Sequence, residues 1–310
     1  MEPKLYIGTG GWQYFIIPGR DPLKEYSRIF DFVEVNSTFY QDISIETVRS
    51  WRRRVPPQFK FSVRAHKTVS HKYLLKPTPE ALRAMERTIE IADTLDSDII
   101  VIETPKHLEI TRDRIKEFME RVGVSDKYIA IEARGGVTKE AMEYMKRDDR
   151  IIPVYDISRE DPPYHHREIS YTRVFGSGRH NIYQFTNDEL RRIYRKATNA
   201  PVKMVLISFH GVRMYTDAGK LRYYYLYKDF PRNKPPYGIE AVKAELMKDM
   251  KFPASREEII RHEGWKVVPL DEKRDIHLGD ILSWLPPGTY KNVDDVIEKL
   301  EKHWPPALKK

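Results

Sequence analysis

The sequence predicts an α/β fold, a (β/α)8 TIM-type barrel with a small C-terminal helical appendage. Short apolar runs rich in β-branched residues recur between residues 4 and 210, and segments with helical periodicity separate most of them. Strands that alternate with helices form a parallel sheet. No G-x-G-x-x-G motif is present, so a closed barrel is favoured over an open, doubly wound sheet.

Eight apolar runs are the expected strands, at residues 4–10, 32–36, 59–66, 98–104, 128–134, 151–156, 169–175 and 203–210. Helices are expected at residues 22–30, 44–54, 78–95, 111–122, 137–147 and 187–198. The helix at 78–95 has a defined start, because Thr78 can cap it and Pro79 suits its first turn. The link from 156 to 169, DISREDPPYHHRE, is too short and too rich in proline for a full helix, so this crossover should be degenerate.

Two domains are expected, a barrel over residues 1–249 and a small helical domain over residues 250–310. The second range contains short helical patterns separated by VVPLDEK and LPPGTY. The stretch at 223–238, YYYLYKDFPRNKPPYG, is aromatic and then basic and proline-rich. It fits either a connector between the domains or a loop that covers the barrel mouth.

The composition favours an anionic partner. Lys and Arg number 54 against 46 Asp and Glu, a net charge of +8. A thermophile surface is the alternative, since 32% of residues are charged, 21 are proline and none is cysteine. The lack of cysteine excludes disulfides, thiolate catalysis and cysteine-ligated metal sites. No membrane span or signal peptide is evident, so we expect a cytoplasmic protein that does not bind membranes.

Polar residues end several expected strands on the face opposite the apolar residues. In FVEVN, Val33 and Val35 share one face while Glu34 and Asn36 share the other. Further inward pairs are Arg64 and His66, Glu132 and Arg134, and Ser208 and His210. Inward residues at the carboxyl end of barrel strands surround the active site. We therefore expect these side chains to face one cavity, unless they form a layer of mutual salt bridges that closes the barrel.

Three stretches resemble the YecE-like barrels, the family called domain of unknown function 72. They are IGTGGWQY, FVEVNSTFYQDISIETVRSWRRRVPPQFKFSVRAHKTVSH and IEARGG, and the resemblance covers about residues 4–245. It implies a TIM-type barrel but no reaction. By matching motif, the family's rim positions fall on Gly8, Trp12, Glu34, Asn36, Phe39, Tyr40, Arg64, His66, His71, Glu132, Arg134, Asp156 and Arg173. The tail from about 250 to 303 resembles the helical domain of unknown function 2795.

Two motifs depart from the family pattern. IETPKHL replaces a stretch that usually contains Gln-x-Pro, so Glu103 adds a carboxylate to the rim. SFHGVRMYTDA differs from the commoner version that contains Asn, and it places His210 at the rim.

The rim residues permit metal binding, phosphate binding or both. Carboxylates and imidazoles of the type that bind divalent ions are Glu34, His66, His71, Glu103, Glu132, Asp156 and His210. The sequence leaves the cofactor undetermined, with a divalent metal as a candidate. Guanidiniums suit phosphate oxygens, and Arg64, Arg134 and Arg173 come from separate strands. Pairing of these arginines with rim carboxylates is the alternative.

The main functional prediction is a hydrolase that acts on a phosphate ester, of the kind found in nucleic acids, at the carboxyl end of the barrel. The expected catalytic residues are Glu34, His66, Glu132 and Asp156. The expected substrate-binding residues are Gly8, Trp12, Asn36, Phe39, Tyr40, Arg64, His71, Arg134, Arg173 and His210. The apurinic endonucleases provide an analogy on the same fold.

Two other functions fit the sequence. The first is a metal-independent sugar-processing barrel that uses Glu34 and Glu132 as paired carboxylates. The second is a non-catalytic module that binds nucleic acid such as DNA, in which the rim is a recognition surface. The sequence determines neither the substrate nor the oligomeric state.

Overall fold

The computed structural model describes residues 2–123, 126–179 and 181–304. The chain divides into two compact units, one of residues 1–174 with 195–210 and the other of residues 175–194 with 211–310. Residues 1, 124–125, 180 and 305–310, which belong to the predicted domain ranges, lie outside the described residues.

The first unit contains a closed barrel of parallel strands in the order β1 to β8. The strands are β1 (Lys4–Thr9), β2 (Phe32–Val35), β3 (Lys60–Arg64), β4 (Ile99–Glu103), β5 (Tyr128–Glu132), β6 (Ile151–Tyr155), β7 (Ile169–Val174) and β8 (Met204–Phe209). The barrel closes where β1 pairs with β8 from Lys4 opposite Met204 to Thr9 opposite Phe209. The predicted TIM-type barrel is confirmed, and every predicted strand contains the observed one.

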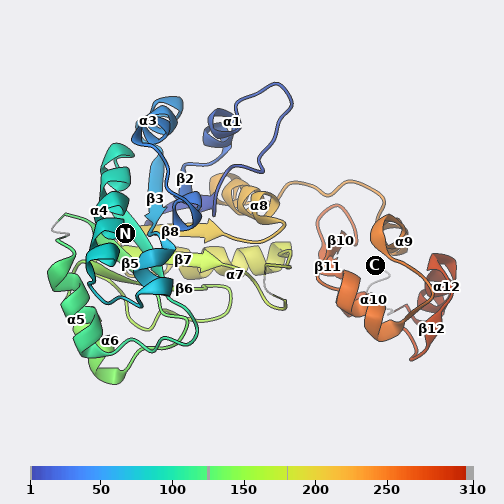
Figure 1. The fold of residues 1–310 in the computed structure, drawn as a ribbon. Helices are drawn as coiled ribbons and strands as arrows, with labels where there is room; N and C mark the ends of the chain where they lie inside the picture. Colours follow the sequence, from blue (N-terminus) through green and yellow to red (C-terminus); the bar gives the residue numbers. More distant parts are fainter. Residues whose placement is uncertain (1, 124–125, 180, 305–310) are drawn as a thin grey trace. The chain divides into compact units, whose positions relative to one another are not determined.

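Helices flank the strands on the outside of the barrel (Figure 1). They are α1 (Pro22–Ile29), α3 (Ile45–Arg54), α4 (Pro79–Thr94), α5 (Arg112–Arg121) and α6 (Lys139–Arg147). The short helices α2 (Ser37–Tyr40) and η1 (Thr68–Lys72) follow the carboxyl ends of β2 and β3, and α7 (Asn187–Thr198) runs from the second unit into the first. Thr78 caps α4 as expected, since its hydroxyl accepts the backbone N–H of Ala81. Among the described residues, no helix lies between β6 and β7, so the degenerate crossover is also confirmed.

The barrel lumen is filled by residues that alternate along the strands. Its apolar cluster includes Phe32, Ala130, Tyr171 and Leu206. Glu34 and Glu132 follow Phe32 and Ala130 by two positions, which places them on the same inward face one layer nearer the carboxyl end. The inward register predicted for these strands is therefore correct.

The second unit has its own hydrophobic core. It contains α8 (Met214–Tyr227), α9 (Gly238–Asp249), α10 (Arg256–Glu263), α11 (Leu278–Leu282) and α12 (Val293–His303). It also contains two antiparallel strand pairs, β10 (Val267–Pro269) with β11 (Asp275–His277), and β12 (Thr289–Tyr290) with β9 (Ala254–Ser255). The predicted tail therefore contains strands as well as helices.

The hydrophobic core of the second unit includes residues that precede the predicted boundary at residue 249. Val242 and Leu246 of α9 are fully buried in the same apolar cluster as Ile259 and Leu300. The second core thus begins before residue 250, because one face of α9 supplies part of it. The stretch at 223–238, expected to be a connector or a loop over the barrel mouth, begins inside α8, which ends at Tyr227.

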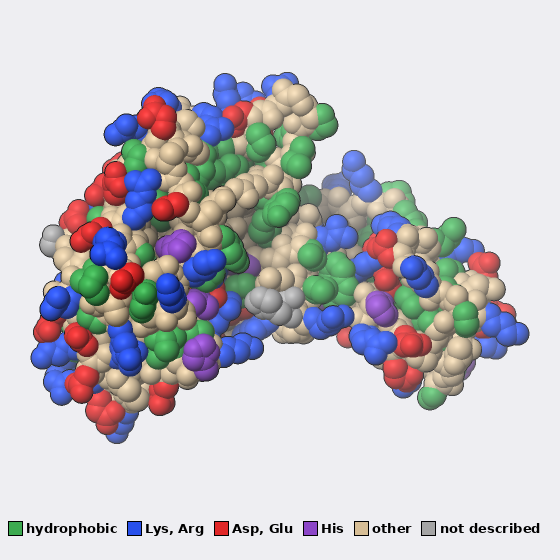
Figure 2. Space-filling view, viewed as in Figure 1, with side chains coloured by type: hydrophobic (Ala, Val, Ile, Leu, Met, Phe, Trp, Pro, Cys, Tyr) green, Lys and Arg blue, Asp and Glu red, His purple; other side chains and the backbone are tan. Residues whose placement is uncertain are grey.

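The surface carries charges of both signs. Figure 2 shows Lys and Arg side chains interspersed with Asp and Glu over the visible face. The net charge of +8 is therefore not gathered into one basic stripe on this face. Within the described residues, no helix combines the length and apolarity needed to cross a bilayer.

The hydroxyl of Tyr26 joins β1 to β2 beneath the rim. Tyr26 is fully buried, and its Oη accepts the backbone N–H of Thr9 at 2.9 Å and donates to the carbonyl of Phe32 at 2.9 Å. The β1–β2 ladder covers little of either strand, with Gly8 opposite Phe32 and Thr9 opposite Val33. This hydroxyl therefore supplements a short strand pairing.

Replacing Tyr26 with Phe should lower the free energy of unfolding by about 1–3 kcal/mol, because the buried N–H of Thr9 loses its acceptor. Urea unfolding would measure the change. Tyr14→Phe is the control, since Tyr14 is 80% exposed and the loss should stay within about 0.5 kcal/mol. Equal stability of both variants would show that the hydroxyl does not stabilise the β1–β2 junction.

Candidate functional site at the barrel mouth

Arg173 of β7 lies at the centre of the inward polar residues. Its Nη1 donates to Glu103 Oε2 at 2.6 Å and also to Glu132 Oε2. Its Nη2 lies 3.1 Å from Glu34 Oε1, and its Nε donates to His210 Nε2 at 3.3 Å. The side chain is 2% exposed. Arg173 is thus committed to protein partners and is not placed to hold a substrate anion, contrary to its predicted role.

Glu103 of β4 connects the other two arginines to Arg173. Its Oε2 lies 2.8 Å from Arg64 Nη2, and its Oε1 lies 2.8 Å from Arg134 Nη1. Arg134 also donates from Nε to Glu132 Oε1 at 2.8 Å. We call Glu34, Glu103, Glu132, Arg64, Arg134 and Arg173 the rim network. The Arg–Glu pairing considered from the sequence is present, and Glu103 has a definite place in it.

The strand register explains why the rim network contains arginines as well as glutamates. Glu103 and Glu132 end adjacent strands and are register partners. Like charges opposite each other on a sheet are destabilising, and buried carboxylates require compensation. Arg173 and Arg134 each contact Glu132, and both also contact Glu103. The guanidiniums therefore allow the carboxylates to share this layer.

Burial and charge act in opposite directions on the carboxylates. Burial by itself raises the pKa of Glu34, but the charge of Arg173, with His210 and Arg64, outweighs it and holds that pKa well below its usual range. The pKa of Glu132 is lowered likewise, because Arg173 and Arg134 outweigh its burial. Both carboxylates are therefore ionised at neutral pH. Glu34 is also fully buried, so a role as general base in contact with substrate is not supported.

A second polar layer lies beneath Glu34. Tyr171 Oη donates to Glu34 Oε2 at 2.8 Å and lies 2.7 Å from Ser62 Oγ. Neither Tyr171 nor Ser62 is among the residues expected at the site from the sequence. The sequence does indicate that both side chains point inward. Tyr171 precedes Arg173 by two positions and Ser62 precedes Arg64 by two, which puts each on the inward face of its strand.

Glycines allow close contacts around His210. A Cβ at Gly10 would lie 2.3 Å from the His210 ring and 2.7 Å from Asn36 Nδ2, which donates to the Gly10 carbonyl at 2.9 Å. Burial and then Arg173 lower the pKa of His210, so its imidazole is neutral and Nε2 accepts from Arg173. Gly8 allows β1 to approach the backbone of β2 closely, since a Cβ at this position would lie 1.9 Å from the Phe32 carbonyl oxygen. Its predicted substrate contact is not supported.

Arg64 is buried, and it lies where the rim network borders side chains that are partly exposed. Its guanidinium carbon lies 3.7 Å from the centroid of the Phe39 ring and 6.0 Å from that of Tyr40. Its Nε is buried and has no hydrogen-bond partner among the described residues. Tyr40 is 64% exposed and the Arg134 side chain 25%. A donor without a partner thus lies beside groups that a ligand can reach.

His71 belongs to the same part of the rim. Its ring packs edge-on against Phe39 with centroids 4.9 Å apart, and its Nδ1 lies 2.9 Å from Ser70 Oγ. Burial lowers the pKa of His71, and the positive charges of Arg64 and Arg134 lower it further against the opposing effect of Glu103. The imidazole is therefore neutral at pH 7 and can accept a proton.

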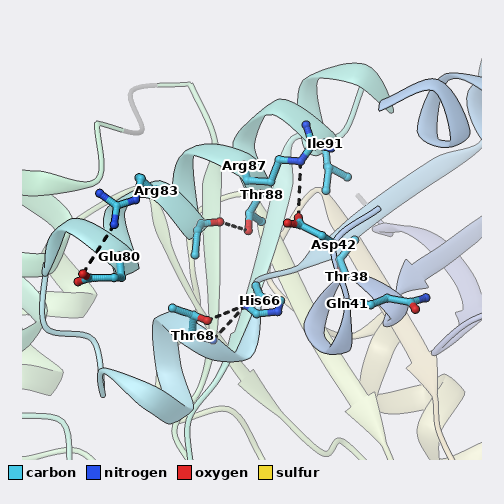
Figure 3. Close-up of a pocket in the computed structure, with 11 residues that line it drawn as sticks. Thr38, Gln41, Asp42, His66, Thr68, Glu80, Arg83, Arg87, Thr88 and Ile91 are labelled. Carbon is cyan, nitrogen blue, oxygen red and sulfur yellow. Dashed lines mark hydrogen bonds and ion pairs between the residues drawn. The ribbon is translucent and has the colours of Figure 1, made fainter. Parts of the chain in front are cut away.

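His66 does not join Arg64 in the rim network. It lines a separate pocket of about 260 Å³ beside α4, with Asp42, Arg83 and Arg87 (Figure 3). Its Nδ1 bonds to Thr68 Oγ1 at 2.9 Å. Strand β3 ends at Arg64, so the two-residue alternation no longer directs the side chain at 66.

Two other predicted residues have local structural roles. The Asp156 carboxylate accepts from Ser158 N at 3.0 Å and lies 3.4 Å from Arg159 Nε, which stabilises the turn after β6. Trp12 is 7% exposed and packs edge-on against Trp51 with ring centroids 5.0 Å apart. Neither arrangement supports the predicted role in catalysis or substrate binding.

The rim does not fit a divalent metal in this arrangement. Within the ranges that the structure describes, no group of three or more His, Asp or Glu side chains is arranged to hold a metal ion. The physical reason is that the carboxylates of Glu34, Glu103 and Glu132 turn toward guanidiniums. We therefore assign no step to a metal.

Replacing Glu34 with Gln should lower the free energy of unfolding at pH 7 by about 3 kcal/mol, the lower end of the cost of breaking a buried ion pair. Glu103 and Glu132 still compensate Arg173 in this variant. Because the folded pKa of Glu34 is depressed, its contribution exists above the usual value of 4.5 and is lost as the pH falls below it. The difference from the parent chain should therefore shrink in acid.

Urea unfolding at pH 7 and pH 3 would measure both effects. Glu46→Gln is the matched control, since the Glu46 side chain is 80% exposed. A stability loss below about 1 kcal/mol at pH 7, or a difference that widens in acid, would contradict the role of Glu34 in the rim network.

Comparison with known proteins places this barrel in a family. UPF0759 protein YecE of Escherichia coli K12 is 34% identical over 74 residues, which are 23% of this chain and 27% of that relative, so the match spans about a quarter of its length. A DUF72 family protein from Enterococcus faecalis has a TM-score of 0.55 at 16% identity, covering 72% of this chain and 98% of that one. Another from Thermotoga maritima has a TM-score of 0.55 at 18% identity, covering 73% and 100%. At these identities the solved structures support the fold alone. The family model described as "Protein of unknown function DUF72" matches residues 6–225, well over half of the 310 residues, and the chain therefore belongs to the DUF72 family.

Proposed function

We propose that the barrel mouth binds and hydrolyses a phosphate ester, with a nucleic-acid phosphodiester as the substrate class. The observation that carries the proposal is the buried, unpartnered Nε of Arg64. A buried donor without an acceptor costs free energy, and a bound oxyanion supplies the missing acceptor. Phosphate oxygens form strong, charge-assisted hydrogen bonds with guanidinium groups.

Arg134 and His71 supply the other groups that this chemistry needs. Arg134 is partly exposed beside Glu103, so part of its guanidinium surface faces away from the rim network. His71 is a neutral imidazole near both arginines, and it acts as the general base that takes a proton from the attacking water. The water oxygen bonds to phosphorus as the ester P–O bond breaks, and the departing alkoxide takes a proton from solvent. In this proposal His71 takes the role predicted for Glu34 and His66. Arg64 and Arg134 take the anion-binding role without Arg173.

The exposed ring of Tyr40 favours a nucleic-acid substrate over an isolated phosphate. Tyr40 is 64% exposed and packs edge-on against Phe39 with ring centroids 4.9 Å apart. Exposed aromatic rings beside arginine provide stacking surfaces for nucleobases. The base would stack on Tyr40 while its phosphate accepts from Arg64.

The sugar-processing alternative lacks a proton donor. It requires one carboxylic acid with a raised pKa. The pKa values of Glu34 and Glu132 are both lowered, and Arg173 contacts both side chains. This pair therefore supplies no general acid.

Arg64→Lys should weaken phosphate binding at least about 10-fold, because lysine keeps the charge but loses the Nε–H donor and the planar fork. Isothermal titration with inorganic phosphate and with a short single-stranded DNA would measure it. Arg49→Lys is the matched control, because that side chain is 59% exposed on α3. Unchanged phosphate affinity in Arg64→Lys would reject the assignment of Arg64.

His71→Gln should reduce hydrolysis of a chromogenic phosphodiester and of DNA about 100-fold or more, the usual contribution of a general base. Phosphate affinity should change little. His165→Gln, at an exposed position, is the control. If the parent chain binds DNA with steep salt dependence but hydrolyses neither substrate, the rim is a binding surface and the hydrolase proposal fails.

A further inference from the structure

The second unit contains a cavity lined by aromatic rings. Its volume is about 420 Å³, within the range of small-molecule sites. Tyr183 comes from the segment between β7 and α7, Trp265 follows α10, and His277 ends β11. Three separate parts of the chain thus bring rings to one cavity. The site belongs to neither the rim network nor the pocket around His66.

Hydrogen bonds to Glu189 hold the rings of Tyr183 and His277 in place. Tyr183 Oη donates to Glu189 Oε1 at 2.5 Å and lies 3.0 Å from His277 Nε2. His277 Nε2 also lies 3.0 Å from Glu189 Oε2, and the two ring centroids are 5.0 Å apart. Gly176, at φ +74°, leaves room for the Tyr183 ring, which a Cβ there would meet at 2.1 Å. These contacts preorganise the rings, which lowers the entropic cost of ligand binding.

Charged groups surround the rings. Arg179 and Arg261 line the cavity, and Asp280 lines it as well. The Arg213 guanidinium lies 6.0 Å from the Trp265 ring centroid and Lys266 Nζ lies 5.8 Å from it. The cavity therefore combines stacking surfaces with guanidinium donors for an anion and one carboxylate acceptor.

We infer that this cavity binds a nucleoside phosphate, as a free nucleotide or as one unit of a single strand. The base would pack on the rings of Trp265 and Tyr183, and stacking of this kind accepts any base. Arg179 and Arg261 would bind the phosphate, and Asp280 would accept from a ring N–H or exocyclic amine. This activity is separate from hydrolysis at the barrel mouth.

The test is isothermal titration of the full chain with AMP, ribose 5-phosphate and a ten-nucleotide single-stranded DNA. The chain carries Arg64→Lys, so that phosphate binding at the barrel mouth contributes little and either proposal can fail alone. AMP should bind with a dissociation constant below about 1 mM. Ribose 5-phosphate should bind at least about 10-fold more weakly, since it lacks the base. Tighter binding of the DNA than of AMP would identify a strand as the ligand, and the reverse order a free nucleotide.

Trp265→Ala should weaken AMP binding about 10-fold or more, and Trp265→Phe should retain most of it because a ring remains. Trp284→Ala is the matched control, since Trp284 is 52% exposed in the same unit and does not line the cavity. If Trp265→Ala does not fold, Arg261→Gln tests the same site through its phosphate contact. Equal binding of AMP and ribose 5-phosphate, unchanged AMP affinity in the Trp265 and Arg261 variants, or no binding would overturn the inference.

Discussion

The buried charge of Arg173 is the constraint on which the barrel mouth depends. A guanidinium that is 2% exposed must be compensated by carboxylates, and it contacts Glu34, Glu103 and Glu132. Those carboxylates come from β2, β4 and β5, while Arg173 comes from β7. The guanidinium of Arg173 thus links the carboxyl end of β7 to those of β2, β4 and β5. Removing one carboxylate weakens this layer, and the two that remain still compensate Arg173.

The need to compensate the buried charge of Arg173 divides the polar residues at the barrel mouth into an inner and an outer group. The inner group is closed, because Arg173, Glu34 and His210 are buried and bonded to one another. The outer group keeps capacity for a ligand in the unpartnered Nε of Arg64 and the neutral ring of His71. Inner residues position outer ones, since Glu103 links Arg173 to Arg64 and Arg134.

The second unit follows a different design. The rings of Tyr183 and His277 in its cavity are held by hydrogen bonds to the Glu189 carboxylate. The pKa of Glu189 is lowered to about 2, because the hydrogen bonds from His277 and Tyr183 outweigh the effect of burial. The recognition proposed there depends on stacking, which tolerates many bases, whereas the recognition proposed at the rim depends on fixed guanidinium geometry.

The sequence by itself determined the barrel, its strand order and the inward face of each strand, because a two-residue period leaves no freedom while the strand continues. Glu34, Arg64 and Glu132 therefore lie where their strands predicted. Arg134 lies two residues beyond the end of β5, and its ion pairs with Glu103 and Glu132 hold it at the predicted place. His66 does not, because β3 ends at Arg64 and the loop geometry then depends on α4. The spacing of apolar residues and the composition also could not show that Arg173 would pair with carboxylates or that Glu103 would bridge the arginines. Nor could they show that α9 would pack into the second core. Only the tertiary structure decided these points, since charge pairing and burial depend on distances between residues far apart in the chain.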